Sequence, residues 1–290
     1  MGIALAEFVE RINQEFPPDT AIDGDVTGLQ IQAGRREISA VLVCLDVTDD
    51  TVMEAEAEGY DAIVSFHPLL FHPLRALTEE ERVGRLCTWL IQRRIALFAL
   101  HTRVDTHPDG TNARFARAMG LRVREPLIRN PRYPGYGMGV IAEADSPIAA
   151  EELLRQVLQL VRKPVRYVPG ASSQLRTIAI VGGSGASFVE AAIACGVDAF
   201  VTGDIKYHTF HQAYRRIWLV DAGHAETERF APDALAEGLR QCLPPDIRIG
   251  ISRKWCTPIR WYGSSEDGSS IVHPPSHEAP DRLSGSDRGH

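Results

Sequence analysis

Short, continuous apolar runs alternate with longer amphipathic stretches along most of this chain of 290 residues. In its first half, residues 39–46, 61–66 and 95–101 are apolar runs of strand length, and residues 48–58 and 82–93 have apolar positions at helical spacing. A short apolar run without polar alternation is typical of a strand that is buried on both faces. Strands that alternate with helices form a largely parallel sheet with helices on its faces, so the sequence predicts an α/β fold.

The same alternation returns in the second half of the chain. It predicts strands at 177–183, 198–204 and 216–223, and helices near 187–196, 208–215 and 226–242. The stretch before them is less regular and contains one strand and one helix, which form either a small inserted unit or a bridge. We therefore predict two α/β halves with mostly parallel sheets. Their expected bounds are 1–125 for the N-terminal half, 126–176 for a short connecting region and 177–262 for the C-terminal half.

The last 28 residues, 263–290, differ in composition from the rest of the chain. Of these residues, 14 are Gly, Ser or Pro, and the only apolar side chains are Ile271, Val272, Ala279 and Leu283. A segment of this kind cannot bury enough apolar surface to offset the entropy that it loses on ordering. We therefore expect a disordered tail.

Charge and cysteine content argue against several classes of protein. Lys and Arg number 31 against 38 Asp and Glu, a net charge of −7, whereas general nucleic-acid binders usually carry a basic surplus. No apolar run approaches the ~18 residues of a membrane helix, and Glu7 and Glu10 stand where an export signal is positively charged. The five cysteines are scattered without a CxxC pair, as in a reduced protein. We expect a cytoplasmic protein without membrane or nucleic-acid partners.

An internal repeat relates the two halves. At a shift of 137 residues, 52–65 aligns with 189–202, although a generic strand–helix–strand pattern would also produce part of this match. At a shift of 123 residues the next strands align, which pairs His101 with His224 and Asp105 with Glu228. The same His-x₃-acid spacing after both strands favours a true duplication with a pseudo-twofold axis.

Histidines and carboxylates follow the predicted strands and indicate a metal site. In open α/β sheets, binding sites lie beyond the carboxyl ends of the strands. Imidazole and carboxylate groups are common ligands of zinc, iron and manganese. A single His-x₃-Asp pair is more often a cap or a surface pair, but seven of the ten histidines lie just after predicted strands. The candidate ligands are His67, His101, Asp105, His224 and Glu228.

A series of motifs in this chain resembles the Nif-three-like proteins, which are known as dinuclear-metal-centre hexameric proteins or GTP cyclohydrolase I type 2 homologues. The resemblance covers roughly residues 3–262. The motifs are DxDxxGLQ at 23–30, LDVT at 45–48, HPLLFHPLRALT at 67–78, HTRVDTHPDGTN at 101–112, GGSG at 182–185, TGDIKYH at 202–208 and DAGHAETE at 221–228.

The resemblance implies a two-domain α/β fold with a pseudo-twofold, assembled into a toroidal homohexamer whose metal sites face the central cavity. It implies up to two divalent metal ions per chain (Zn, Fe or Mn). The ligands that it implies are His67, Asp105, His224 and Glu228, with Glu228 bridging the two ions. His101 would lie at or next to the site.

One position departs from the pattern of the resembled family. Relatives usually carry two adjacent histidines before the Pro-Leu pair, but here Phe66 precedes His67 and cannot bind a metal. One of the two ions therefore loses a ligand, and the second site is in doubt. Water, His72 or His107 could take the vacant place, although both histidines are more typical of surface residues or of outer partners of a ligand.

A dinuclear site suits the hydrolysis of a nucleotide-like molecule, because two metal ions activate a bridging water and clamp the attacked group. Asp204 and His208 follow the strand at 198–204, so they are our candidates for acid/base catalysis or for holding a ligating histidine. Asp204 could instead cap the next helix. Lys206 and Tyr207 could steer a phosphate.

Two alternatives stay open from the sequence. The GGSG turn at 182–185 resembles a phosphate-binding turn, but a tight strand-to-helix connection needs the same glycines. For the whole protein, the alternative to a metal-dependent hydrolase is a metal-binding hexameric assembly or regulatory partner that catalyses no reaction. Phe66 favours this second function to some extent, because an incomplete site can still bind a metal after catalysis is lost.

Overall fold

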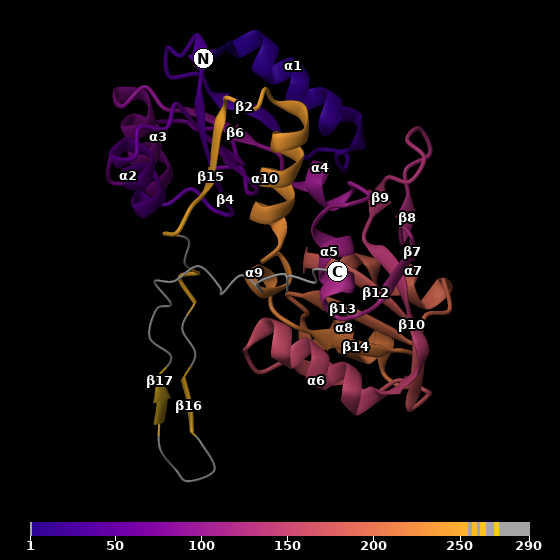
Figure 1. Cartoon of the computed structure of the whole chain (residues 1–290). Helices are drawn as coiled ribbons and strands as arrows, with labels where there is room; N and C mark the ends of the chain where they lie inside the picture. The colour runs from indigo at the N-terminus through magenta and orange to yellow at the C-terminus, as the bar shows by residue number, and fades with distance from the viewer. Residues whose placement is uncertain (1, 255–256, 260–261, 265–269, 273–290) are drawn as a thin grey trace, which may run out of the picture.

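The computed structural model describes residues 2–254, 257–259, 262–264 and 270–272. Within this part of the chain, two main β-sheets carry helices on their faces, which confirms the α/β class (Figure 1). Each sheet forms the centre of one lobe, and α9 (His224–Thr227) lies where the two lobes meet. None of the helices within these residues is long and apolar enough to span a membrane.

The first sheet has five strands, four of them parallel. Its strands are, in spatial order, β15 (Arg248–Ile251), β4 (Ala40–Cys44), β5 (Ala62–Ser65), β6 (Ala96–Ala99) and β2 (Gly28–Ile31). Only β2 runs antiparallel, along the outer side of β6. Side chains alternate between two cores, so that Val41 and Val43 pack on one face of the sheet and Leu42 and Cys44 on the other. This burial on both faces explains the continuous apolar run in the sequence.

The second sheet has six strands and a mixed topology. Its strands are, in spatial order, β11 (Arg166–Val168), β14 (Trp218–Asp221), β13 (Ala199–Gly203), β12 (Gln174–Ser184), β10 (Val140–Ala149) and β7 (Arg122–Glu125). In this sheet only the pairs β12–β13 and β13–β14 are parallel, and the other three pairs of neighbouring strands are antiparallel. The mostly parallel arrangement that the sequence predicted therefore holds for the first sheet and for the centre of the second.

Helices cover both sheets, and most of the predicted ones lie close to their expected positions, whereas the helices at 102–105 and 111–118 were not predicted. One exception is the helix predicted at 226–242, which is divided because Pro232 has no N–H to donate to the carbonyl of Glu228. The helices besides α9 are α1 (Leu5–Glu15), α2 (Asp49–Ala57), α3 (Arg82–Gln92), α4 (Thr102–Asp105), α5 (Thr111–Ala118), α6 (Ala150–Val161), α7 (Val189–Ala194), α8 (Tyr207–Ala213) and α10 (Ala231–Cys242).

Chain segments cross between the predicted halves in both directions. Strand β15 pairs with β4 in the first sheet, and Leu235 and Leu239 of α10 pack with Phe8 of α1 in the core of the first lobe. In the other direction, β10 and β11 from the expected connecting region 126–176 are part of the second sheet. Periodicity alone did not show these memberships, because an apolar face does not identify the surface that it packs against. The division into 1–125, 126–176 and 177–262 itself stays a prediction.

The repeat at a shift of 137 residues is visible as a repeated hydrogen-bond pattern. Asp61 Oδ2 accepts bonds from the backbone N–H of Ser39 at 2.8 Å and of Ala40 at 3.1 Å. Asp198 Oδ2 accepts the equivalent bonds from Arg176 and Thr177, both at 2.8 Å. Each aspartate therefore fixes the start of the strand beside its own, and the same device recurs in both sheets.

The next strands of the repeat are offset by one residue from the sequence alignment. Leu100 donates to Ser65 O, and Ala222 donates to Thr202 O, so the structural shift is 122 residues rather than 123. Gly223 therefore stands in the place of His101, and His224 lies one position further along. The alignment that paired the two histidines missed this single extra residue after β14.

Short elements complete the described chain. Three pairs of short antiparallel strands are β1 (Ile3–Ala4) with β3 (Glu37–Ile38), β8 (Ile128–Arg129) with β9 (Gly137–Met138), and β16 (Tyr262–Ser264) with β17 (Ser270–Val272). Two 3₁₀ helices lie at Pro18–Thr20 and Ala186–Phe188. The disorder expected for 263–290 falls mainly on 265–269 and 273–290, which lie outside the described residues.

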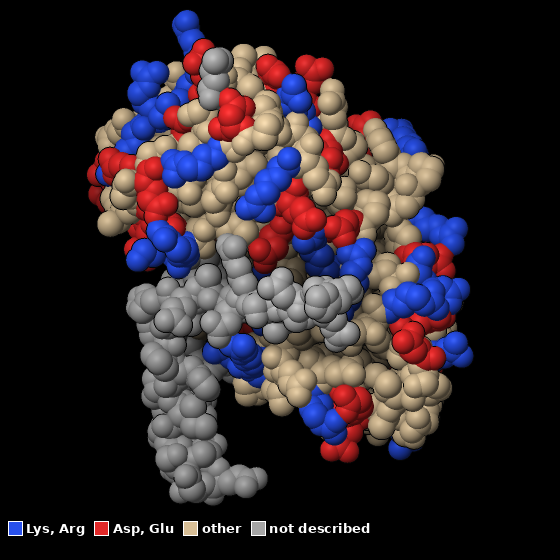
Figure 2. Space-filling model, viewed as in Figure 1, with Lys and Arg blue, Asp and Glu red and all other residues tan. Residues whose placement is uncertain are grey.

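Charged side chains of both signs are mixed over the face of the molecule in Figure 2. Among the described residues, ion pairs include Arg11 with Glu7 at 2.8 Å and Arg85 with Asp49 at 2.9 Å. This face presents no continuous basic stripe of the kind that binds nucleic acid. The expectation that nucleic acid is not a partner stays a prediction.

Candidate metal centre

Two histidines and a glutamate from different elements converge at the junction of the lobes. His67 follows β5 in the first sheet, His224 begins α9 after β14 in the second, and Glu228 ends α9. Glu228 Oε2 lies 3.2 Å from Nε2 of His67 and 3.2 Å from Nε2 of His224. One ligand atom from each residue lies within 4.8 Å of the other two, a spacing that a single metal ion can bridge. We call these three residues the triad.

A glycine near the end of β12 lets the backbone lie directly against the Glu228 side chain. Gly183 at the end of β12 has φ +65°, and a Cβ atom built there would lie 2.2 Å from Glu228 Oε1. The N–H groups of Gly182 and Gly183 donate to Asn112 Oδ1 at 2.7 Å and to Thr227 Oγ1 at 2.9 Å. These two N–H groups are therefore already used within the protein. The first glycines of the GGSG turn accommodate the triad rather than present donors to a phosphate.

An aspartate accepts a hydrogen bond from Nδ1 of each histidine at this junction. Asp46 Oδ1 lies 2.9 Å from Nδ1 of His67, and Asp204 Oδ2 lies 2.7 Å from Nδ1 of His224. Such a bond fixes the ring and leaves the lone pair of Nε2 for a metal, as in many metalloproteins. Asp204 holds this position with a left-handed φ of 56°. Asp204 thus contacts a predicted ligand, which is one of the two roles that the sequence left open for it.

His101 has the same arrangement but is not part of the triad. Its Nδ1 lies 2.7 Å from Asp25 Oδ1, and Asp25 Oδ2 accepts a bond from the N–H of Thr102 at 3.2 Å. The His101 ring lies 5.6 Å from the His67 ring, centroid to centroid. The structure therefore places His101 next to the triad, and its role as a ligand stays a prediction.

Asp105 is buried close to the triad without joining it. Its carboxylate atom Oδ1 has no hydrogen-bond partner within the described residues. Burial, together with the nearby negative charge of Glu228, raises the pKa of Asp105 well above its ordinary value. A cation beside this carboxylate would relieve the cost of burying it, so Asp105 also stays a predicted ligand.

Sequence reasoning missed the contributions of Asp25 and Asp46. Both residues were part of quoted motifs, and Asp46 follows the carboxyl end of β4 at the same edge of the sheet as His67. That position was an available signal for Asp46. Asp25 lies in the loop before β2, where only the fold shows that it reaches His101.

The electrostatics of the triad favour a positive charge between its members. Burial opposes protonation of His67, but the carboxylates of Asp46 and Glu228 outweigh burial and raise the pKa of His67 to about 10. Contact with Glu228 raises the pKa of His224 to about 9, against the effect of burial and with help from Asp204. Burial would raise the pKa of Glu228, but the two imidazoles lower it. Protons or a metal ion can supply the positive charge.

The donor set fits a divalent cation. Glu228 Oε2 is buried and makes no hydrogen bond of proper geometry within the described chain, although two imidazole nitrogens lie near it. A buried oxygen of this kind is costly unless it binds a cation or a proton. Two nitrogen ligands and one carboxylate oxygen form a set that Zn²⁺ and other transition-metal ions accept with one coordination position left open.

Comparison with known proteins assigns the family. The family model Duf34/NIF3 (NGG1p interacting factor 3) matches residues 3–254. The chain belongs to the Duf34/NIF3 family. This confirms the resemblance that the motifs carry.

Named relatives and solved structures of the Duf34/NIF3 family cover most of this chain. A GTP cyclohydrolase 1 type 2 homolog of Streptomyces coelicolor is 32% identical over 93% of this chain and 99% of its own length. One from Nostoc is 34% identical over 73% of this chain and 82% of its own. A hypothetical protein of Staphylococcus aureus has TM-score 0.76 and 28% identity, over 87% of this chain and 97% of its own. A Bacillus cereus protein related to NIF3 has TM-score 0.78 and 23% identity, over 89% of this chain and 99% of its own. At this identity the match shows the fold alone.

In this member of the Duf34/NIF3 family, Phe66 is a residue of the hydrophobic core. Its side chain is fully buried, and its ring lies 5.0 Å from the His67 ring and 5.5 Å from the His101 ring, edge to face in both cases. The suggested substitutes do not join the triad. The His72 ring packs edge to face against Phe71, and His107 lies 3.8 Å from Glu15. Among the described residues, the triad is the one group of side chains whose spacing could hold a metal ion.

His208 lies apart from the triad in the contacts that the structure shows. It is exposed on α8, and its ring contacts are with Tyr207 at 5.3 Å and His211 at 6.5 Å. Its proposed part in catalysis therefore has no support from these contacts and stays a prediction.

Proposed function

We propose that the triad binds a divalent metal ion and that the protein is a metal-dependent hydrolase of a nucleotide-like molecule. The convergence of His67, His224 and Glu228 on one point carries the proposal. The name of the relatives, GTP cyclohydrolase 1 type 2 homolog, supports the reaction class and the nucleotide. Zinc, iron and manganese all suit the nitrogen and oxygen donors.

Each residue of the site has a distinct task in this proposal. Glu228 holds its carboxylate between the two imidazoles, while Asp46 and Asp204 keep Nε2 of each ring directed at the same point. A bound metal ion would lower the pKa of a coordinated water and polarise the attacked group. Asp204 has a half-exposed side chain, so it can also exchange a proton with substrate or solvent.

The test combines metal analysis with turnover. Purified protein is stripped with a chelator and titrated with Zn²⁺, Mn²⁺ and Fe²⁺, and the loaded protein is assayed with GTP by following its ultraviolet spectrum. We expect about one ion per chain and a metal-dependent reaction that Glu228→Gln abolishes. Fewer than one ion per chain, with no response to added metal, would count against any metal function.

A second function has a specific observation in its favour. The Phe66 ring is buried where the resembled family pattern has a histidine, so by that pattern this chain has one ligand fewer than a dinuclear site needs. A metal-binding but inactive assembly, or a regulatory partner protein, is the alternative that this observation supports. Metal binding at one ion per chain without turnover of any nucleotide would favour it.

Assembly and location belong to the same proposal. We infer a cytoplasmic homohexamer. The hexamer rests on the resemblance of the motifs to the dinuclear-metal-centre hexameric proteins, and the location rests on the scattered cysteines, which are typical of a reduced protein. The mass of the full-length protein in solution, measured by light scattering, tests the hexamer directly.

A further inference from the structure

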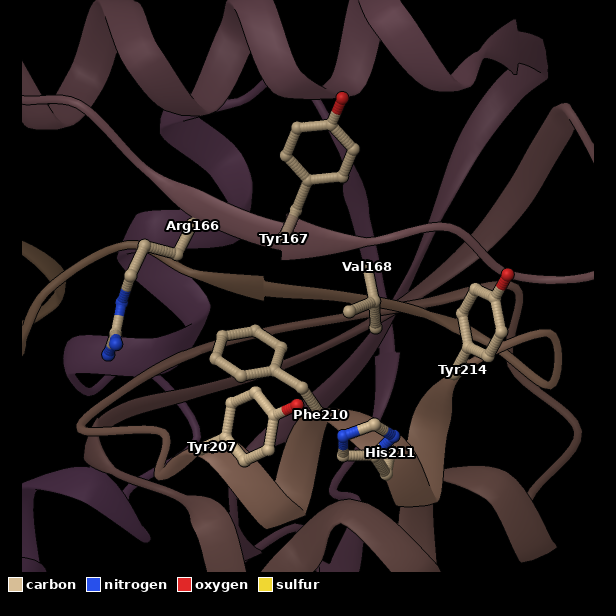
Figure 3. A pocket seen from close by; sticks show the side chains of 7 residues that line it. All are labelled: Arg166, Tyr167, Val168, Tyr207, Phe210, His211 and Tyr214. Atoms are coloured by element: carbon tan, nitrogen blue, oxygen red, sulfur yellow. The ribbon is translucent and has the colours of Figure 1, made fainter.

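A pocket of about 330 Å³ lies between helix α8 and strand β11, outside the triad. Its volume is at the lower end of the ~300–1,000 Å³ that is usual for small-molecule sites. Figure 3 shows its walls, which come from β11, from α8 and from the residue that follows α8. Among the residues that line it are Arg166, Tyr167, Tyr207, Phe210, His211 and Tyr214.

Aromatic rings dominate the pocket and are unusually open to solvent. Tyr207 is 70% exposed and Tyr214 is 45% exposed. The Tyr207 ring lies 4.9 Å from that of His211, and Figure 3 shows Tyr207, Phe210 and His211 together on the α8 side of the pocket. Exposed rings that line a concave surface offer flat faces on which another planar ring can stack.

The segment that contains α8 is rich in basic side chains, of which Arg216 is already paired with Glu190 at 3.1 Å. Residues 205–220 include Lys206, Arg215 and Arg216 but no Asp or Glu. The Arg166 guanidinium lies 5.5 Å from the centre of the Phe210 ring. Basic groups interleaved with aromatic rings favour a ligand that is both planar and negatively charged.

Hydrogen bonds connect this pocket to the metal centre. Arg166 Nη2 donates to Ile205 O at 2.9 Å and also pairs with Asp221 at the end of β14. Ile205 follows Asp204, whose carboxylate lies 2.7 Å from Nδ1 of His224. The loop that joins β13 to α8 therefore contacts the triad at one end and begins the pocket wall at the other.

We propose that this pocket binds a planar aromatic group with an attached negative charge, such as the base and phosphate of a mononucleotide. The base stacks on Tyr207 and Phe210, and Lys206 and Arg166 attract the anionic part. The reaction at the triad rests on the proposed function, but binding in the pocket is a separate property that can be measured without metal.

The experiment measures binding of GMP and AMP to the full chain by calorimetry, after a chelator has removed metal. We expect Tyr207→Leu and Phe210→Leu each to weaken binding about ten-fold or more, which is the scale of one lost stacking contact. Ribose 5-phosphate, which has the charge without the ring, should bind much more weakly than GMP. Tyr133→Leu, a tyrosine replaced elsewhere on the molecule, serves as the matched control and should leave binding unchanged.

The outcomes separate this inference from the proposed function. Glu228→Gln should keep nucleotide binding while metal binding is lost, so failure of turnover leaves the pocket assignment intact. Unchanged affinity in both Tyr207→Leu and Phe210→Leu would overturn the inference, as would absence of nucleotide binding to the unaltered protein. A Tyr207→Leu variant that loses oligomeric mass, together with no nucleotide binding, would instead identify the pocket as a contact between copies of the chain.

Discussion

Gly183 and Glu228 pack so closely that no side chain fits between them. A Cβ atom at residue 183 would lie 2.2 Å from Glu228 Oε1 and 3.4 Å from His224 Nε2. This contact ties the end of β12 to the ligands on α9, so the backbone of the second sheet sets the position of the triad carboxylate.

Replacing Gly183 with alanine should disturb both stability and metal binding. The left-handed φ and the clash with Glu228 together should lower the free energy of unfolding by about 3 kcal/mol. Metal affinity should fall at least about ten-fold, because the carboxylate must move. Gly196→Ala is the matched control, since φ is +69° there but nothing lies within 4 Å of the added Cβ. It should cost only about 1–2 kcal/mol of stability. Equal metal affinity in the two variants would contradict the contact.

Glu228→Gln should lower the metal content more than Asp204→Asn does. Glu228 Oε2 lies between the two imidazole nitrogens, whereas Asp204 contacts only the outer nitrogen of His224. The Asp204 variant should lose about 10–100-fold in metal affinity, the usual effect of removing a partner of a ligand. Elemental analysis of dialysed proteins gives the metal-to-protein ratio. Equal ratios in both variants would show that our assignment of direct and indirect roles is wrong.

Phe66→His should raise the metal-to-protein ratio if a ligand is missing at that position. The new imidazole would lie beside His67 and His101, where the Phe66 ring now packs. Burying a polar ring should cost about 3 kcal/mol of stability. Phe98→His is a suitable control, because Phe98 is equally buried but packs on Phe8, and it should lose stability without gaining metal. A ratio that does not change would mean that water or another residue already fills the place.

The aspartates behind the histidines provide a test of which rings bind the metal. Asp46→Asn should weaken metal binding about 10–100-fold, because Asp46 orients the triad ligand His67. Asp25→Asn should have a similar effect only if His101 is a ligand, since Asp25 contacts that ring. Metal titration of the two variants under the same buffer conditions gives the comparison. An Asp46→Asn variant with unaltered affinity would argue against His67 as a ligand.

The central strands of both sheets, the α/β class and the candidate ligands could be predicted from the sequence because they depend on local patterns. Apolar runs such as 39–46 have to be buried on both faces, and the edge where parallel strands end is where polar side chains gather. His67, His224 and Glu228 were candidates for this reason. The offset of the repeat was not visible, because one extra residue after β14 leaves the pattern of apolar positions unchanged.

The sequence by itself determined which side chains stand at the ends of strands. Only the tertiary structure decided which of them meet. Strand β15 and helix α10 return to the first lobe, and β10 and β11 complete the second sheet, although local spacing gives no sign of either. Contacts such as Asp25 with His101 and Gly183 with Glu228 join residues far apart in the chain. Their distances depend on how two sheets pack together, which periodicity within one segment does not specify.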